Sequence, residues 1–354
     1  MKTHYAAVAV LCAMAVLCSS AAVLLATDAD ADASVFEGYY KNQLTSSQKA
    51  IYEAMVGLSA DVAVNDDGAG GYYIEVTVPS NSDHDALLKD AERAWQATKL
   101  EASADNKWSF WTWGLTDAKP SITVPDDTHI RVSVASQFSG GFSSAVAAVT
   151  AAVDAIEISG STDAEKVRNI NSKLTSSTYV YVASNADHVY ANTLYSVASD
   201  NLADGKAYMT SFAYSALFKA LCTKYGVSCT QVYGLYGNDG IAYAWNIVLM
   251  DGRSYAADSA TNSTSGNKEL WLGSGLYTTD GTDPFGKVHE AFPYSVAAGL
   301  TYDFESETLN NNEYSWPEDT SILAKLVEYA PWILVGIICA VVSVALIVMA
   351  KRGD

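Results

Sequence analysis

Residues 211–258 read SFAYSALFKALCTKYGVSCTQVYGLYGNDGIAYAWNIVLMDGRSYAAD, and this stretch decides the fold. Apolar residues recur at helical spacing over residues 211–225, so the first part predicts a helix. Shorter apolar runs follow at residues 231–233, 243–250 and 253–257, and they predict strands. A helix followed by strands, with Asp258 directly after the last of them, is therefore the expected centre of the molecule.

The order of these residues resembles the core of the transglutaminase-like superfamily, whose papain-related fold also includes peptide N-glycanase. In that family a Cys opens the helix in a pattern like C-x-G-Y-A-x-x-F-K-x-L. A G-I/V-x-C segment, an H-A-W-N-x-V-x-x-D/N-G-x-x-Y segment and an Asp follow. Aligned without gaps on Phe218 and Lys219, the chain has Ser211 at the position of the Cys. Tyr243 stands at the position of the His, and Asp258 at that of the Asp.

The resemblance implies a site at these positions that lacks two of the family's chemical groups. The family's mechanism needs a thiolate at a helix N-terminus, a His that takes its proton and an Asp that orients the His. Ser211 offers a hydroxyl instead, and Tyr243 a phenol, of which only about one in a thousand is ionised at pH 7. Asp258 completes the triad-equivalent positions, while Trp245 and Asn246 match the family's Trp and Asn and are the predicted binding residues.

The altered positions also have structural explanations, and a rescue of the chemistry stays open. Thr210 or Ser211 is suited to cap the helix that follows, and Tyr243 to fill the vacated site. Asp258 would then accept a hydrogen bond from Tyr243 or Ser211. Two histidines outside the motif, His188 and His289, are alternatives for the missing base.

Two apolar runs predict the topology. The Ala-rich run 6–26 favours a signal peptide within residues 1–30, with a retained N-terminal anchor as the alternative. The uncharged run 331–350 has the length of a transmembrane helix, and Lys351 and Arg352 follow it. We therefore expect the bulk of the chain to be extracellular, anchored to the cell membrane, with a short cytoplasmic C-terminal tail.

The net charge, the absence of known sequence motifs and the cysteine positions limit which ligands, cofactors and disulfides can be expected. The net charge of −19 disfavours nucleic acid and suits a solvated exterior or cationic ligands. The chain has no sequence motif for metal, phosphate or dinucleotide binding, so no metal and no cofactor are predicted. Cys222 and Cys229 are the cysteines outside the apolar runs. They are a disulfide candidate in an exported region, with two buried thiols as the alternative.

The predicted fold class is α+β. A small α+β region over residues 35–160 precedes a papain-like, transglutaminase-like domain over residues 161–300. A polar juxtamembrane linker over residues 301–328 then leads to the C-terminal transmembrane helix.

The function predicted from these features is binding or scaffolding at the cell surface by a degenerate transglutaminase-like domain. The resemblance points to a protein, peptide or cell-envelope ligand. The alternative is an active hydrolase or acyltransferase, of protease or transamidase type, with Ser211 as nucleophile. A structural surface-layer component without a ligand is a third interpretation, and the sequence leaves open whether the chain is an enzyme.

Overall fold

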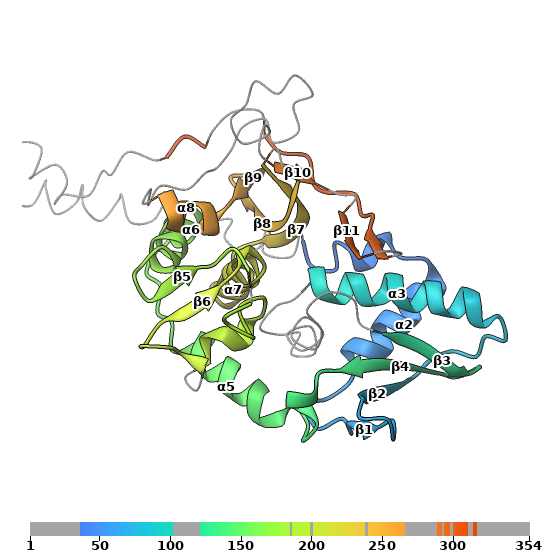
Figure 1. Ribbon diagram of the computed structural model, residues 1–354. Helices are drawn as coiled ribbons and strands as arrows, with labels where there is room; N and C mark the ends of the chain where they lie inside the picture. Colours follow the sequence, from blue (N-terminus) through green and yellow to red (C-terminus); the bar gives the residue numbers. More distant parts are fainter. Residues whose placement is uncertain are drawn as a thin grey trace, which may run out of the picture. The chain divides into compact units, whose positions relative to one another are not determined.

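The fold was analysed in a computed structural model of the chain (Figure 1). It describes residues 36–101, 121–184, 186–198, 201–237, 240–265, 289–291, 294–297, 300–310 and 314–316. The predicted signal peptide and the predicted transmembrane helix over residues 331–350 lie outside these ranges. Within them, no helix is both long and apolar enough to cross a bilayer. The chain divides into two compact units, Met1–Tyr314 and Ser315–Asp354, and every helix and strand below belongs to the first.

The N-terminal part of the mixed α+β fold is an antiparallel sheet packed against helices, with strand order β1-β2-β4-β3. Its strands are β1 (Asn65–Asp66), β2 (Tyr72–Thr77), β3 (Ile122–Asp126) and β4 (His129–Val134). Helices α2 (Ser46–Val56) and α3 (His84–Leu100) pack against each other, and α3 packs on β3 (Figure 1). Alternate residues of β4, among them Ile130 and Val132, are buried. One face of this sheet therefore contributes to the core, as period-two alternation predicts.

Short elements connect this sheet to the centre of the fold. They are the 3-10 turns η1 (Lys41–Gln43), η2 (Ser136–Phe138) and η3 (Leu194–Val197), helices α5 (Ser143–Asp154) and α6 (Asp163–Leu174), and the parallel strands β5 (Tyr179–Tyr181) and β6 (Ala207–Met209). A capping box formed by Thr162 and Glu165 begins α6. Lys224 fixes the end of α5, because its ammonium group donates to the carbonyl oxygens of Val153, Asp154 and Ile156.

Helix α7 (Ser211–Lys224) is the central helix of the fold. All of its residues up to Cys222 are buried, which is typical of a core helix with no solvent face. It contacts α6, α8, β7 and β8. After the helix, Gly226 adopts a positive φ of 71°, a conformation that glycine allows and that ends many helices.

A second antiparallel sheet packs on α7, with strand order β10-β7-β8-β9. Its strands are β7 (Cys229–Tyr236), β8 (Ile241–Met250), β9 (Arg253–Ala257) and β10 (His289–Ala291). Helix α8 (Ser259–Ser265) follows β9 after one residue, and β11 (Tyr294–Ala297) pairs with β12 (Leu300–Tyr302). The helix and strands expected from residues 211–258 are thus confirmed in their order, while β10 was not foreseen as a member of their sheet.

Residues 303–310 and Tyr314, here called the strap, pack on the rest of the first unit. Phe304 is buried against Tyr40 and the guanidinium of Arg93, with ring centroids 5.2 Å apart in the first contact. Asn310 donates through its main-chain N–H to the carbonyl of Ser254 in β9, at 2.8 Å. Residues 303–310 and Tyr314, which fall in the range predicted as a juxtamembrane linker, are therefore folded within the first unit.

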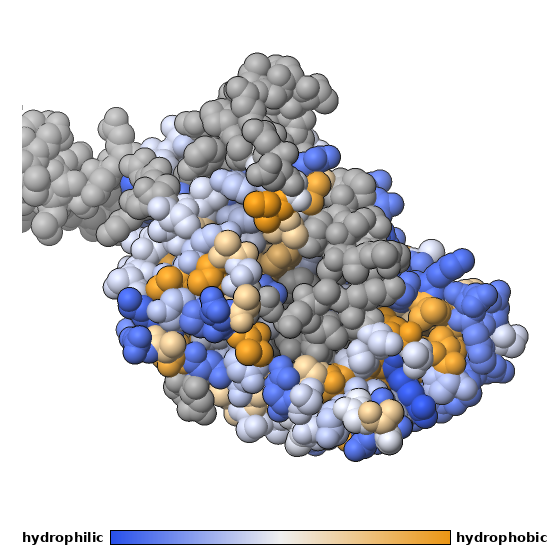
Figure 2. Space-filling model, in the orientation of Figure 1, coloured by the Kyte–Doolittle hydropathy of each residue, from blue (hydrophilic) through white to orange (hydrophobic). Residues whose placement is uncertain are grey.

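One face of the molecule shows how its apolar side chains are distributed (Figure 2). In the orientation of Figure 1, hydrophobic residues form small, separate areas among hydrophilic ones (Figure 2). Val189 and Ile241 are the exposed large hydrophobic side chains of the described residues, at 60% and 55% exposure. Isolated apolar side chains of this kind are usual on soluble domains.

Candidate functional site

Ser211 is the first residue of α7, but its hydroxyl does not cap the helix. The N-cap residue is Thr210, whose hydroxyl instead donates to the side-chain oxygen of Asn192 at 2.8 Å. The Oγ of Ser211 accepts a hydrogen bond from the main-chain N–H of Ala244 in β8, at 3.3 Å. Ser211 is 2% exposed. Its hydroxyl therefore joins the helix to the strand. Of the two residues expected at the N-cap, Thr210 occupies that position, without a side-chain capping bond.

Asp258 is the residue on which the site converges. It lies between β9 and α8, and its Oδ1 accepts from the hydroxyl of Tyr243 at 3.2 Å and from the N–H of Thr261 at 3.0 Å. Its Oδ2 contacts the hydroxyl of Thr261 at 2.6 Å and Nε2 of His289 at 2.9 Å. Each carboxylate oxygen of Asp258 therefore has two polar contacts. The sequence suggested Tyr243 or Ser211 as the donor to Asp258, and the donor is Tyr243.

Tyr243 carries a phenol that stays protonated. Burial raises its pKa well above the ordinary value of 10, and the neighbouring charge of Asp258 raises it further. A hydrogen bond with Thr261, at 3.0 Å, lowers the pKa of Tyr243, but this effect is smaller than the other two. A protonated phenol donates to the carboxylate and cannot take a proton from a serine hydroxyl.

His289 reaches Asp258 from β10, at the edge of the sheet. Three aromatic rings surround its imidazole, those of Tyr236 and Trp245 at 5.0 Å and that of Tyr243 at 5.8 Å between centroids. All three meet it nearly edge to face, at interplanar angles of 71–77°. We call the space enclosed by Tyr236, Tyr243, Trp245 and Asp258 the imidazole recess.

The sheet register explains why these groups meet. His289 pairs with Tyr236, and Gly234 pairs with Tyr243 across β7 and β8. Because directly paired residues share a face and side chains alternate along each strand, His289, Tyr236, Tyr243 and Trp245 all project from one face of the sheet. The opposite face, which includes Asn246, packs on α7.

Trp245 and Asn246, the predicted binding residues, are both buried. The side-chain amide of Asn246 donates to the carbonyl oxygens of Ser215 at 2.9 Å and Thr230 at 3.3 Å. Asn246 therefore ties α7 to β7 and is committed to internal hydrogen bonds. Trp245 forms a wall of the imidazole recess, and its buried indole N–H finds no acceptor among the described residues.

The two cysteines outside the apolar runs are free thiols. Cys222 lies in α7 and Cys229 begins β7, and both are buried. Burial raises the pKa of the Cys222 thiol well above its usual range. Of the two arrangements that the sequence left open, a disulfide or two buried thiols, the structure has the two buried thiols.

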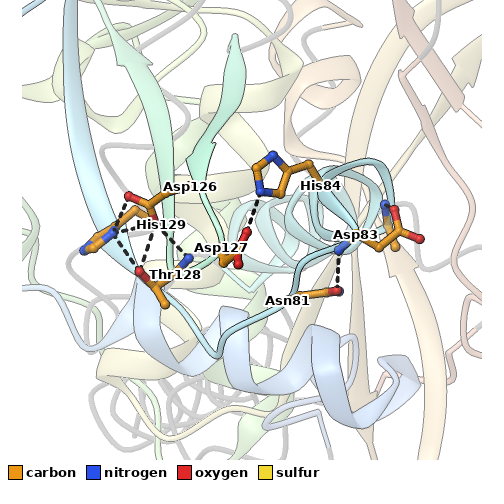
Figure 3. Close-up of polar contacts among 8 residues, drawn as sticks. Asn81, Asp83, His84, Asp126, Asp127, Thr128 and His129 are labelled. Atoms are coloured by element: carbon orange, nitrogen blue, oxygen red, sulfur yellow. Dashed lines mark hydrogen bonds and ion pairs between the residues drawn. The ribbon is translucent and has the colours of Figure 1, made fainter.

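The remaining described histidines lie elsewhere. His188, the other alternative base, stacks on Tyr208 of β6 with ring centroids 3.9 Å apart. At the turn between β3 and β4, His129 contacts Asp126 at 2.9 Å, and His84 of α3 contacts Asp127 at 2.8 Å (Figure 3). Over the described ranges, no three His, Cys, Asp or Glu side chains are grouped so as to hold a metal ion.

Sequence reasoning did not identify two of the residues that build the site. Thr261 had a signal, because it lies three residues after Asp258, the spacing at which an Asp side chain caps a helix. Tyr236 had none. Its contact with His289 depends on the pairing of β10 with β7, which brings together residues from distant parts of the chain.

Comparison with known proteins adds little. No protein-family model matches the chain, and no curated protein matches it significantly. Among solved structures, a chain described as a TGase is 15% identical, with 73% of this chain and 67% of that chain covered. The TM-score is 0.26. A likeness at that level carries no argument, so the proposals below rest on the geometry of the site and on the sequence pattern.

Proposed function

We propose that the chain is a non-catalytic binding or scaffolding module with a degenerate transglutaminase-like site, tethered to the outer face of a cell membrane. The observation that carries the proposal is the saturation of Asp258. Tyr243 occupies one oxygen of the carboxylate as a protonated donor, and Thr261 contacts both oxygens. In a working triad that carboxylate would orient a base directed at the nucleophile.

Ser211 lacks the other half of such a unit. Among the described residues, the hydrogen bond recorded for its Oγ comes from the N–H of Ala244, which can donate but cannot accept a proton. A serine hydroxyl without a base is a poor nucleophile. The membrane tether is supported by the uncharged run 331–350 and the basic residues Lys351 and Arg352 after it.

One observation favours a second candidate, an acyl-transfer enzyme. The pair of His289 and Asp258 is buried and 2.9 Å apart, and it has the form of an oriented general base. In that mechanism Ser211 Oγ would attack a carbonyl carbon while the imidazole of His289 took the hydroxyl proton, and the leaving group would later receive it. His289 would then replace the family's histidine from a different strand.

Covalent labelling separates the two candidates. The full chain, with Ser211→Ala as the matched control, is exposed to a fluorophosphonate probe and to peptide and amide substrates. We expect no label at Ser211 and no turnover above that of Ser211→Ala. Labelling of native Ser211 that disappears in both Ser211→Ala and His289→Ala would overturn the proposal in favour of the enzyme.

The tether is tested independently. Protease added to intact cells should remove residues 36–316 and spare a tag after Asp354. Protection of the acidic region would contradict the proposed orientation.

A further inference from the structure

Strand β10 is a small addition to the edge of the second sheet. It pairs with β7 over His289↔Tyr236, Glu290↔Leu235 and Ala291↔Gly234, whereas β7 and β8 pair along the whole length of β7. An edge of this kind is where an extended peptide adds to a sheet, because the main-chain groups of the edge strand are available for pairing. Of the residues that the structure describes, the chain uses three of its own, His289–Ala291, at that place.

The side chain that β10 inserts fits a recess suited to basic groups. The imidazole recess has aromatic walls, from Tyr236, Tyr243 and Trp245, and the carboxylate of Asp258 at its end. Aromatic rings and a carboxylate together favour a cationic, hydrogen-bond-donating side chain over an apolar one.

The wall of the recess also keeps an unused donor. With β10 in place, the indole N–H of Trp245 is buried and has no acceptor in the part of the chain that the structure describes. A buried donor without a partner is costly, and high-resolution structures contain few of them. A bound chain that brings a carbonyl oxygen to this wall would recover that interaction.

Gly234 makes room for the main chain of the added strand. A Cβ atom at this position would lie 2.0 Å from the carbonyl oxygen of Glu290 and 2.7 Å from the ring of Trp245. A glycine is therefore needed here because the backbone of β10 approaches closely, and not because of an unusual φ. Any extended peptide can bring its main chain this close to Gly234. Because Glu290 is exposed, the side chain at its position does not restrict which peptide fits.

We propose that the edge of β7 and the imidazole recess form a strand-binding site, which β10 fills within the chain and which takes an extended segment of a partner protein carrying a basic side chain at the position of His289. The proposal rests on the proposed binding function and names its ligand class. The net charge of −19 favours such a ligand, because an acidic surface attracts basic segments.

A labelled peptide with the sequence of residues 286–292, GKVHEAF, tests the site by fluorescence anisotropy with the full chain. The variant His289→Ala empties the recess. The variant Glu290→Pro puts a proline at the middle residue of β10, where it disfavours strand pairing, and leaves every wall of the recess intact. We expect both variants to bind the peptide saturably and at least about ten-fold more tightly than the native chain, since the competing strand is weakened.

Two comparisons decide whether the recess recognises a basic group. A peptide with Ala in place of His should bind Glu290→Pro at least about ten-fold more weakly, and one with Lys should retain binding. Adding Asp258→Asn to Glu290→Pro should abolish that preference. Absence of saturable binding by both variants, or equal binding of the His and Ala peptides, overturns the strand-binding site.

These outcomes are distinguishable from the failure of the proposed function. Lack of label at Ser211 together with lack of peptide binding leaves a non-catalytic module without this site. Label at Ser211 together with selective peptide binding would instead assign the recess to an enzyme.

Discussion

His289 Nε2 lies 2.9 Å from Asp258 Oδ2, and both side chains are 1% exposed. Asp258 thereby receives a histidine from β10, whereas the sequence motif leads one to look for it on β8, at Tyr243. The carboxylate is held by both residues at once, one on each oxygen. The docking of a short edge strand is thus coupled to the group on which the site converges.

The coupling predicts that Gly234→Ala will disrupt β10. The added Cβ would collide with the carbonyl oxygen of Glu290, which belongs to the backbone and cannot move without the strand. We expect a loss of about 2 kcal/mol in the free energy of unfolding, within the range for overpacked sites. Hydrogen exchange at residues 289–291 should become faster. Gly140→Ala is the matched control, because a Cβ there meets nothing within 4 Å. Equal stability of the two variants would contradict the close approach.

The centre of the fold could be predicted from the sequence because its signals are local. Apolar spacing marks α7, and the polar turn at Asp251 and Gly252 separates β8 from β9 with positive φ values of 51° and 69°. The alignment on Phe218 and Lys219 then puts Ser211 at the helix start, where the structure has it.

The partner of Asp258 could not be predicted in the same way. His289 is separated from Asp258 by 31 positions, and no turn or periodicity specifies that residues 289–291 pair with β7. The strap was missed for a related reason. Its sequence is polar, and its attachment depends on a few contacts, such as Phe304 with Tyr40, made to residues far along the chain.

The strap predicts a stability contribution from Phe304. Its ring is buried, with the guanidinium carbon of Arg93 3.5 Å from the ring centroid. Phe304→Ala should lower the free energy of unfolding by about 3 kcal/mol, the usual scale for a buried aromatic ring. Thr308→Ala, at an exposed position of the same strap, should change it by less than about 0.5 kcal/mol. Urea denaturation measures both, and similar values for the two variants would indicate that the strap does not pack stably.

The buried phenols predict a loss of stability in alkali. Burial raises the pKa of Tyr214 to about 12 from 10.0, partly offset by its hydrogen bond with Ser263. A raised folded pKa means that the unfolded chain releases the proton first. The contribution to stability is therefore complete below pH 10 and is lost as the pH rises toward about 12. Phenolate absorbance should show Tyr214 and Tyr243 titrating late or only on unfolding. Tyr214→Phe should remove one of the late-titrating groups, and an unchanged titration would contradict the assignment.

Introducing the Cys and His of the transglutaminase-like pattern tests whether the site can support thiolate chemistry. Ser211→Cys alone should react slowly with iodoacetamide, because the buried site offers it no base. Adding Tyr243→His places an imidazole beside Asp258, on the residue that precedes Ala244, whose main-chain N–H contacts Ser211 Oγ. That thiol should react at least about ten-fold faster, since both the imidazole and the helix N-terminus stabilise a thiolate. Adding His289→Ala should increase the rate again, because His289 then no longer competes with the new imidazole for Asp258.

The control for this series is Ser211→Cys with His289→Ala, in which Tyr243 is retained. If Ser211→Cys alone were as reactive as the version with Tyr243→His, a base would already serve position 211. If that reactivity also disappeared on adding His289→Ala, the base would be His289. The pair with Asp258 would then belong to a triad rearranged between strands, and the acyl-transfer candidate would replace the binding module.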